Sequence, residues 1–305
     1  MPIVVNGTTL TDLKVGNTDI TKVYARNGIT GAYILVFEKS GGGGGGTTMA
    51  LFFGGNWKMN NLKADIDAYF STFNSALELN ENKRVVIFPP ACYLEYTKSK
   101  IASNLRNMVY VGAQMISNET RGAYTGQLSA NMIKDCGCTD VLVGQAECRE
   151  YLGITNTDCN RQVQQGLSAD LTVWLCVGET LEIREADTYE DYITNQLQEA
   201  FSGVAPTYFE SGKVVINYEP IWAIGTGKTY PPEEADRMCM LIKQWVSNGY
   251  GDIAADKTEV VYGGSVKVTN IEELISKPNI NGTLAGGISL KADDFATMIN
   301  IAGNR

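Results

Sequence analysis

The sequence contains no histidine in its 305 residues. An imidazole acid, base or metal ligand is therefore excluded everywhere in the chain. The seven cysteines are odd in number and scattered, so they do not form the paired framework of a disulfide-rich protein. Cys136 and Cys138 are too close for a zinc knuckle, and no histidine could complete such a site. We expect buried or inert thiols, and neither a metal nor another cofactor.

Basic charge and long apolar runs are also missing. A net charge of -9 argues against nucleic acid as a partner, because a phosphate backbone calls for clustered Lys and Arg. No run of 18 apolar residues exists, so we expect no membrane span. The start, MPIVVNGTTL, lacks the basic, apolar and small-residue segments of a signal peptide. The expected location is the cytoplasm, where the protein is made.

The most irregular stretch is a run of six glycines at 41–46. Glycine adds backbone entropy without packing, so residues 41–48 are predicted to form a flexible linker. Residues 1–40 repeat an Asn/Gly turn followed by alternating Thr and β-branched or aromatic residues, which is a hairpin signal. They predict a small all-β attachment or oligomerisation module with little core of its own. An added solubility or expression segment is the alternative.

Residues 49–305 alternate apolar runs with amphipathic stretches. Continuous Val/Ile-rich runs predict parallel strands buried on both faces, and the intervening patterns, as at 64–79 and 232–246, predict helices. Eight such alternations in about 250 residues favour an α/β fold of the closed (β/α)8 barrel type. The apolar runs are 51–57, 84–90, 108–114, 140–146, 172–179, 214–220, 259–265 and 282–289.

Polar residues and glycines gather where these strands end, which is where such barrels build their active sites. Lys58 could hold an anionic substrate, and Glu219 at the end of an apolar run could be a base with a raised pKa. Residues 220–228 have the composition of a hinged lid, or of an ordinary glycine-rich turn. Glycine pairs at 263–264 and 286–287 would let backbone N–H groups approach a phosphate.

These motifs together resemble the triosephosphate isomerase family over residues 49–305. The motifs that carry the resemblance are GGNWKMN, GAYTGQLS, CVGET, YEPIWAIGTGK, VYGGSV and GGISL. The resemblance implies a TIM barrel that interconverts dihydroxyacetone phosphate and glyceraldehyde 3-phosphate through an enediolate, without a cofactor. It implies that Glu219 is the catalytic base and that the substrate is held by Asn56, Lys58, Gly225, Ser265, Gly286 and Gly287. It also implies a lid, latched by Tyr262 and Ser265, made of Pro220, Ile221, Trp222, Ala223, Ile224, Gly225, Thr226, Gly227 and Lys228.

The loop after the fourth strand departs from the family pattern Gly-His-Ser-Glu-Arg-Arg. Gln145 takes the place of the electrophilic histidine, and Ala146 and Cys148 replace the serine and an arginine. A glutamine amide can polarise a carbonyl but cannot practically shuttle a proton. Gln127 replaces the glutamate of the family's dimer loop, although Thr125 is retained, and Met115 replaces an asparagine. These changes predict reduced turnover and an altered homo-oligomer interface.

Two functional hypotheses follow. In the first, a catalytically impaired barrel is carried on an N-terminal anchor as a structural, decoration or binding module. Residues 1–40 are loosely similar to modules at the termini of phage virion proteins, so the partner would be a virion or a larger assembly. In the second, the chain is a working, slowed triosephosphate isomerase with an N-terminal extension. Under either hypothesis the barrel binds a triose phosphate or a similar small phosphorylated anion.

Overall fold

The computed structural model describes residues 4–5, 8–9, 13–15, 18–20, 22–26, 33–38, 50–78, 80–223 and 230–302. The chain divides into two units, Met1–Thr47 and Thr48–Arg305. In the first unit the strands form antiparallel pairs: β1 (Val4–Val5) with β2 (Thr8–Thr9), β3 (Leu13–Val15) with β4 (Thr18–Ile20), and β5 (Lys22–Arg26) with β6 (Tyr33–Glu38). The role of residues 1–40 as an attachment module and of 41–48 as a linker stays a prediction.

The second unit is a closed barrel of eight parallel strands, which confirms the predicted fold class. The order around the barrel is the order along the chain, with β14 pairing with β7 to close the ring. The strands are β7 (Leu51–Asn56), β8 (Lys83–Phe88), β9 (Val109–Ala113), β10 (Asp140–Val143), β11 (Thr172–Val177), β12 (Val214–Tyr218), β13 (Glu259–Tyr262) and β14 (Gly282–Ala285). Each strand ends before the last residue of the apolar run that predicted it, because the final residues of the run already belong to the site loops.

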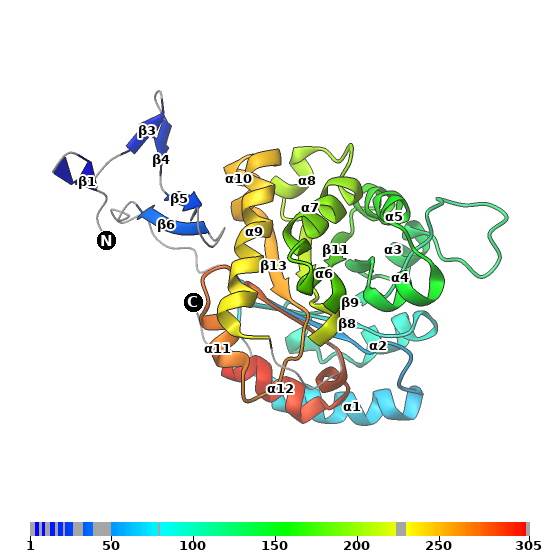
Figure 1. The fold of residues 1–305 in the computed structure, drawn as a ribbon. Coiled ribbons are helices and arrows are strands. Elements are labelled where there is room, and N and C mark those ends of the chain that lie inside the picture. The colour runs from blue at the N-terminus through cyan, green and yellow to red at the C-terminus, as the bar shows by residue number, and fades with distance from the viewer. Residues whose placement is uncertain are drawn as a thin grey trace. The chain divides into compact units, whose positions relative to one another are not determined.

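Helices surround these strands (Figure 1). They are α1 (Lys63–Ala76), α2 (Leu94–Lys100), α3 (Ala130–Asp135), α4 (Ala146–Leu152), α5 (Asn156–Ser168), α6 (Leu181–Glu185), α7 (Tyr189–Ala200), α8 (Pro206–Glu210), α9 (Pro232–Tyr250), α10 (Asp252–Lys257), α11 (Ile271–Ser276) and α12 (Ala292–Ile301). Short 3-10 turns are η1 (Ala91–Tyr93), η2 (Ser103–Leu105), η3 (Ile221–Ala223) and η4 (Gly287–Leu290). Both helices expected at 64–79 and 232–246 are therefore present.

The barrel has two apolar layers. The larger layer lies between the strands and the helices, where alternate strand residues such as Val85, Val141 and Ile216 are buried. The smaller layer fills the barrel interior and includes Phe88, Trp174 and Val215. At the N-terminal end of the barrel the Trp174 indole N–H donates to buried Asp140 at 2.9 Å, so that end is filled. The space for a ligand therefore lies at the other end of the barrel, where the strands have their C-terminal ends.

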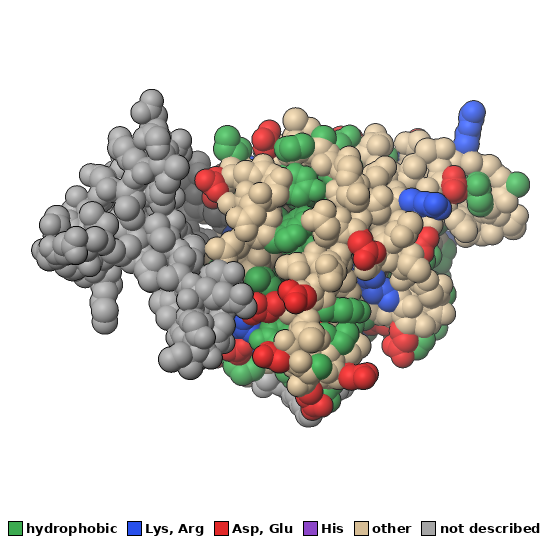
Figure 2. Space-filling model, turned by 45° about the horizontal axis from the view of Figure 1, so that its top comes forward, with side chains coloured by type: hydrophobic (Ala, Val, Ile, Leu, Met, Phe, Trp, Pro, Cys, Tyr) green, Lys and Arg blue, Asp and Glu red, His purple; other side chains and the backbone are tan. Residues whose placement is uncertain are grey.

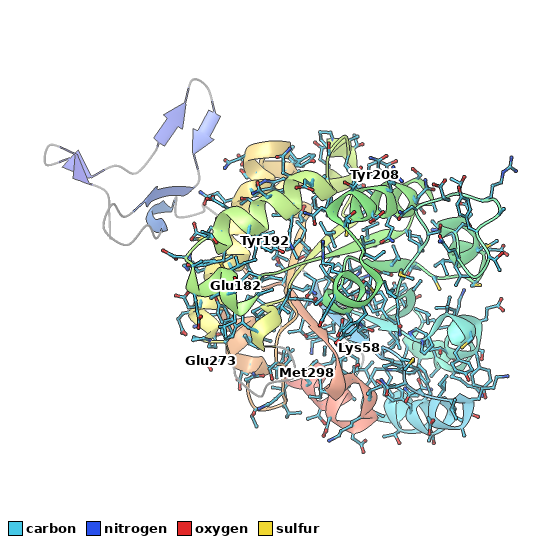
Figure 3. All side chains as sticks on the ribbon, turned by 45° about the vertical axis from the view of Figure 1, so that its right-hand side comes forward. Lys58, Glu182, Tyr192, Tyr208, Glu273 and Met298 are labelled. Atoms are coloured by element: carbon cyan, nitrogen blue, oxygen red, sulfur yellow. The ribbon has the colours of Figure 1, made fainter. Side chains whose placement is uncertain are left out.

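The surface of the described residues agrees with the acidic composition. On the face drawn in Figure 2 the Lys and Arg side chains form no continuous patch. Figure 3 shows Lys58 among the strand-end loops, inside the ring of helices that carries Tyr192, Tyr208 and Met298. Among the described residues, no helix is both long enough and apolar enough to cross a bilayer.

Candidate active site

A cavity of about 290 Å³ lies at the C-terminal ends of β7, β12, β13 and β14. Its lining contains most of the predicted site residues, brought together from opposite ends of the sequence. These residues are Asn56, Lys58, Glu219, Ser265, Gly286 and Gly287. Parallel strands deliver their ends to one rim of a barrel, which explains why residues more than 200 positions apart share one cavity.

Glu219 directly follows β12 and is almost fully buried. Its Oε1 accepts a hydrogen bond from Nδ2 of Asn217 at 2.8 Å, and its Oε2 lies 3.4 Å from the backbone nitrogen of Ala146. Burial raises the pKa of the Glu219 carboxyl to about 7, and the negative charge of Glu147 adds to the rise. Lys58 and the two hydrogen bonds act in the opposite direction. A carboxylate with a pKa near neutrality is suited to take and return a proton.

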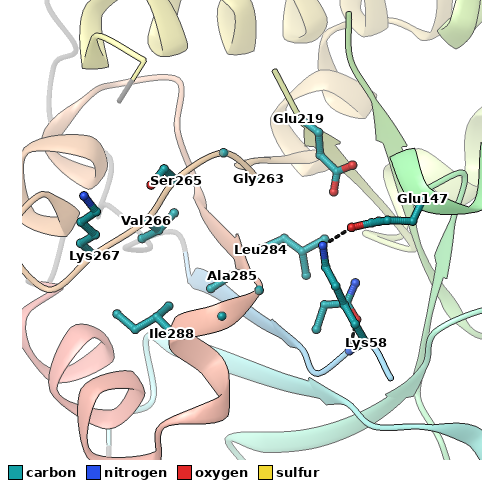
Figure 4. A pocket seen from close by; sticks show the side chains of 14 residues that line it. Lys58, Glu147, Glu219, Gly263, Ser265, Val266, Lys267, Leu284, Ala285 and Ile288 are labelled. Atoms are coloured by element: carbon teal, nitrogen blue, oxygen red, sulfur yellow. Dashed lines mark hydrogen bonds and ion pairs between the residues drawn. The ribbon is translucent and has the colours of Figure 1, made fainter. Parts of the chain in front are cut away.

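Lys58 follows β7 in a left-handed backbone conformation, with φ at 52°. Two polar contacts hold this unusual backbone: the Lys58 N–H donates to Oδ1 of Asn56 at 2.9 Å, and the Lys58 carbonyl accepts from Nε2 of Gln114 at 2.8 Å. The ammonium group forms an ion pair with Glu147. Figure 4 shows Glu147 joined to Lys58, with the Glu219 carboxylate above them. An anionic ligand in the cavity would share the cation of Lys58 with Glu147.

Gln145 follows β10 and begins helix α4, but it is not among the residues that line the cavity. Its Nε2 donates to the backbone carbonyl of Gln114 at 2.7 Å, and Gln114 in turn holds the backbone of Lys58. The side chain is buried, and its Oε1 has no hydrogen-bond partner among the described residues. The amide that was predicted to polarise a substrate carbonyl thus supports the neighbouring loop. Its catalytic role stays a prediction.

Both glycine pairs line the cavity. Gly286 and Gly287 join β14 to η4, and Gly286 lies so close to Lys58 that an added Cβ would be 3.6 Å from Cε of the lysine. Gly263, Gly264 and Ser265 leave the end of β13 and line the same cavity. Two glycine-rich turns beside a lysine form a surface of the kind that holds phosphate.

The lid prediction is only partly covered by the structure. Pro220 is followed by the η3 turn, and Nε1 of Trp222 donates to Oε1 of buried Glu179 at 3.0 Å. The hydroxyl of Tyr218 donates to the same oxygen at 3.0 Å, so Glu179 ties the start of this segment to β12. Tyr262, a predicted latch, is buried at the end of β13. The remaining lid residues, Ile224, Gly225, Thr226, Gly227 and Lys228, lie outside the described residues.

The residues that depart from the family pattern have their own local partners. Oε1 of Gln127 accepts from the hydroxyl of Ser117 at 2.5 Å, within one loop. Thr125 and Met115 are exposed on the same loop. Burial raises the pKa of the Cys148 thiol to about 11, so this thiol is neutral at ordinary pH. Among the described residues, no group of three His, Cys, Asp or Glu side chains is arranged to hold a metal ion.

Two residues of the site are missing from the sequence prediction. Glu147 stands two positions after Gln145 in the same loop, and its retention beside so many changed residues was a usable signal. Asn217 stands two positions before Glu219. Because alternate strand residues share a face, this spacing places the two side chains on the same side of β12.

Comparison with known proteins agrees with this geometry. Residues 51–302 match the sequence model of a family described as triosephosphate isomerase. Three proteins of that name are similar to the chain. The one from Taenia solium is 39% identical over 82% of this chain and 97% of its own length. Those from Pelodictyon phaeoclathratiforme and Hydrogenovibrio crunogenus are each 41% identical, over 81% and 84% of this chain and 96% and 99% of their own lengths.

Proposed function

Because the chain belongs to the triosephosphate isomerase family, we propose that its barrel interconverts dihydroxyacetone phosphate and glyceraldehyde 3-phosphate. The observation that supports this most directly is the convergence of Glu219, Lys58 and the two glycine-rich turns on one cavity. A working enzyme is the better supported of the two hypotheses, since a carrier module has no need of a buried carboxylate with a pKa near 7.

In the proposed reaction Glu219 takes a proton from the carbon next to the substrate carbonyl. The electron pair moves into the carbonyl to form an enediolate, whose charge Lys58 stabilises. Glu219 then returns the proton to the adjacent carbon, and the hydroxyl proton of one substrate oxygen moves to the other, so the atoms balance and no cofactor enters the reaction. Backbone N–H groups around Ser265, Gly286 and Gly287 would hold the phosphate.

We propose that the step at the two substrate oxygens is slow. Proton exchange between these oxygens needs a group that titrates, and Gln145 does not, so Glu219 would have to carry this proton as well. Loss of one polarising or proton-transferring group costs about 10²–10⁴-fold in rate. Enzyme accelerations begin near about 10⁶-fold, so turnover would persist at a reduced level.

The test is a coupled isomerase assay of the full chain in both directions, together with calorimetric titration of phosphoglycolate. We expect measurable turnover, and anion binding that the Lys58→Met variant weakens by about tenfold or more. The matched control is Lys291→Met, whose exposed lysine lies outside the cavity and leaves both readouts unchanged. A chain that neither turns over substrate nor binds the anion would contradict the proposal.

For residues 1–40 we propose an oligomerisation or attachment module, supported by the antiparallel strand pairs of this region. The virion as its target stays a prediction from the sequence, as does a role as a decoration protein. The dimer loop offers a second contact, since Tyr124 and Leu128 beside Thr125 and Gln127 are exposed. Sedimentation of the full chain and of a chain starting at Met49 distinguishes oligomerisation through residues 1–40 from oligomerisation through the dimer loop. Equal masses for both chains would contradict a role of residues 1–40 in oligomerisation.

A further inference from the structure

Asn217 is an amide in the apolar interior of the barrel. It lies on β12 between Cys176 of β11 and Val261 of β13, its register neighbours. The alternation of the strand places it on the same face as Val215, which belongs to the interior apolar cluster, and as Glu219. Its side chain is completely buried. A polar side chain in such a place needs an explanation, because its removal from water is costly.

Stability does not supply that explanation. Nδ2 of Asn217 donates to Oε1 of Glu219 at 2.8 Å and lies 3.4 Å from Sγ of Cys176, a weak acceptor. Oδ1 has no hydrogen-bond partner among the described residues. A buried acceptor left unpaired destabilises a fold, so an apolar residue of the same shape would be the more stable choice. What the amide does achieve is the contact with Glu219.

That contact is the stronger of the two hydrogen bonds that the Glu219 carboxylate accepts. The other, from the Ala146 backbone, is 3.4 Å long, and alanine offers no side-chain donor. An ionised carboxylate only accepts hydrogen bonds, so it is the NH2 group of Asn217 that must face it. Within the described part of the chain, the other charged or titratable groups near Glu219 are Lys58, Glu147 and the thiols of Cys148 and Cys176.

The end of β13 closes over this pair. A Cβ added at Gly263 would lie 2.5 Å from Oδ1 of Asn217 and 2.8 Å from Cγ of Glu219. Real Cβ atoms do not come so close to other atoms, so the backbone at this position leaves the two side chains no free space on that side. Amide and carboxylate are therefore confined against each other, with the carboxylate directed toward the cavity (Figure 4).

We propose that Asn217 is a positioning residue for the isomerase reaction, which holds the Glu219 carboxylate in its reactive direction and favours its ionised form. The inference rests on the proposed role of Glu219 as the base. Asn217 does not line the cavity, so it acts on turnover through Glu219 and not through substrate binding.

The test compares Asn217→Ala and Asn217→Leu with the native chain. Leucine keeps the branched shape and the number of side-chain heavy atoms but removes the donor, and alanine removes both. We expect kcat to fall about tenfold with little change in KM, because the variants redirect Glu219 and leave the groups that bind the substrate unchanged. The acidic limb of the kcat/KM profile should move up by about one to two pH units, since a hydrogen bond to the charged form is lost. Asn281→Ala is the matched control, a buried amide whose Oδ1 accepts from Val260 outside the cavity.

A second readout does not depend on turnover. Carbon-13 NMR of labelled glutamate, assigned through Glu219→Gln, follows the titration of Glu219 in each folded chain. The midpoint should rise in both Asn217 variants and stay in place in Asn281→Ala. If the native chain shows no isomerase activity, the proposed function fails while this titration still tests Asn217. Equal midpoints in the native chain and the Asn217 variants would overturn the inference.

If neither variant folds, the native chain itself gives the answer. The nitrogen-15 resonance of the Asn217 side chain should titrate with the same midpoint as the Glu219 carboxyl, because the amide donates directly to it. A side-chain resonance that does not change through that pH range would overturn the inference.

Discussion

The loops that follow β10 and β12 carry the two chemical halves of the site, and they differ in how their polar groups are used. After β12, Glu219 is directed into the cavity and is supported by Asn217 from the same strand. After β10, the amide of Gln145 is bonded to the backbone of Gln114 and lies outside the cavity lining. One loop presents a carboxylate to the cavity, and the other supports the backbone of Lys58 through Gln114.

Under the proposed function, the groups for binding and for proton abstraction face the cavity while the amide of Gln145 is engaged elsewhere. The two loops meet where the Ala146 backbone approaches Glu219. Glu147, also after β10, pairs with Lys58 after β7, so the β10 loop contacts both of these groups. Substitutions in the two loops should therefore have different effects on kcat and on ligand binding.

The largest effect is expected on the β12 side. Glu219→Gln removes the base and should lower kcat by about 10²–10⁴-fold, because the amide cannot take the proton. Binding of phosphoglycolate should persist, since Lys58 and the glycine turns are unchanged. The coupled assay and calorimetry measure both, with the exposed Glu182→Gln as control. Turnover at the native rate would remove Glu219 from the mechanism.

On the β10 side, a substitution is expected to raise kcat. Gln145→His restores a titrating side chain and should raise kcat by about 10²-fold, the lower end of what such a group contributes. Gln145→Ala should change kcat by less than about tenfold, because the amide donates to Gln114 and not to the cavity. Steady-state kinetics of both variants measure these changes in kcat. A large loss in Gln145→Ala would show that the native glutamine polarises the substrate.

The third effect is the pH dependence on the β12 side. Glu219 works ionised, so turnover should fall as the pH drops through about 7, the value to which burial raises its pKa. Stability depends on pH in the opposite direction. The fold favours the neutral carboxyl, so its contribution is complete below the ordinary pKa of 4.5 and is lost as the pH rises through about 7.

Denaturant unfolding of the native chain and of Glu219→Gln, which stays neutral, tests this sign. The variant should gain stability over the native chain as the pH rises from 4.5 to 8. A difference in stability that is constant over that range would contradict the burial of a titrating Glu219.

The smallest effect compares two glycines. Gly144, after β10, has φ at 73°, and a Cβ there would lie 2.8 Å from Sγ of Cys159. Gly263, after β13, instead faces Asn217 and Glu219. Alanine at either position should cost about 1–3 kcal/mol in the free energy of unfolding. Only Gly263→Ala should also lower kcat markedly, because it displaces the base. Equal losses of kcat in the two variants would contradict the division between the loops.

Much of the fold could be predicted because each apolar run carries its own strand signal. Val/Ile-rich runs such as 84–90 predict buried parallel strands wherever they stand, and eight of them with helices between leave few architectures. Positions of the base and the lysine followed from their place after such runs. Strand ends were predicted too late, because apolar residues of the site loops continue the pattern past the last ladder hydrogen bond.

The direction of side chains could not be predicted in the same way. Gln145 takes the place of an electrophile in the sequence, yet the carbonyl of Gln114 from the neighbouring strand end receives its amide. The pairing of Glu147 with Lys58 likewise joins residues 89 positions apart. Such contacts depend on the closure of the ring, which brings the ends of β7, β9 and β10 to one rim.

By itself the sequence determined the absence of imidazole chemistry, the parallel barrel and the carboxylate and lysine at its strand ends, because these follow from residue type and local pattern. Only the tertiary structure decided that Gln145 supports a loop while Asn217 supports the base. Both are buried amides beside the site, and their roles differ because of the groups that barrel closure and strand alternation place within hydrogen-bonding distance of each.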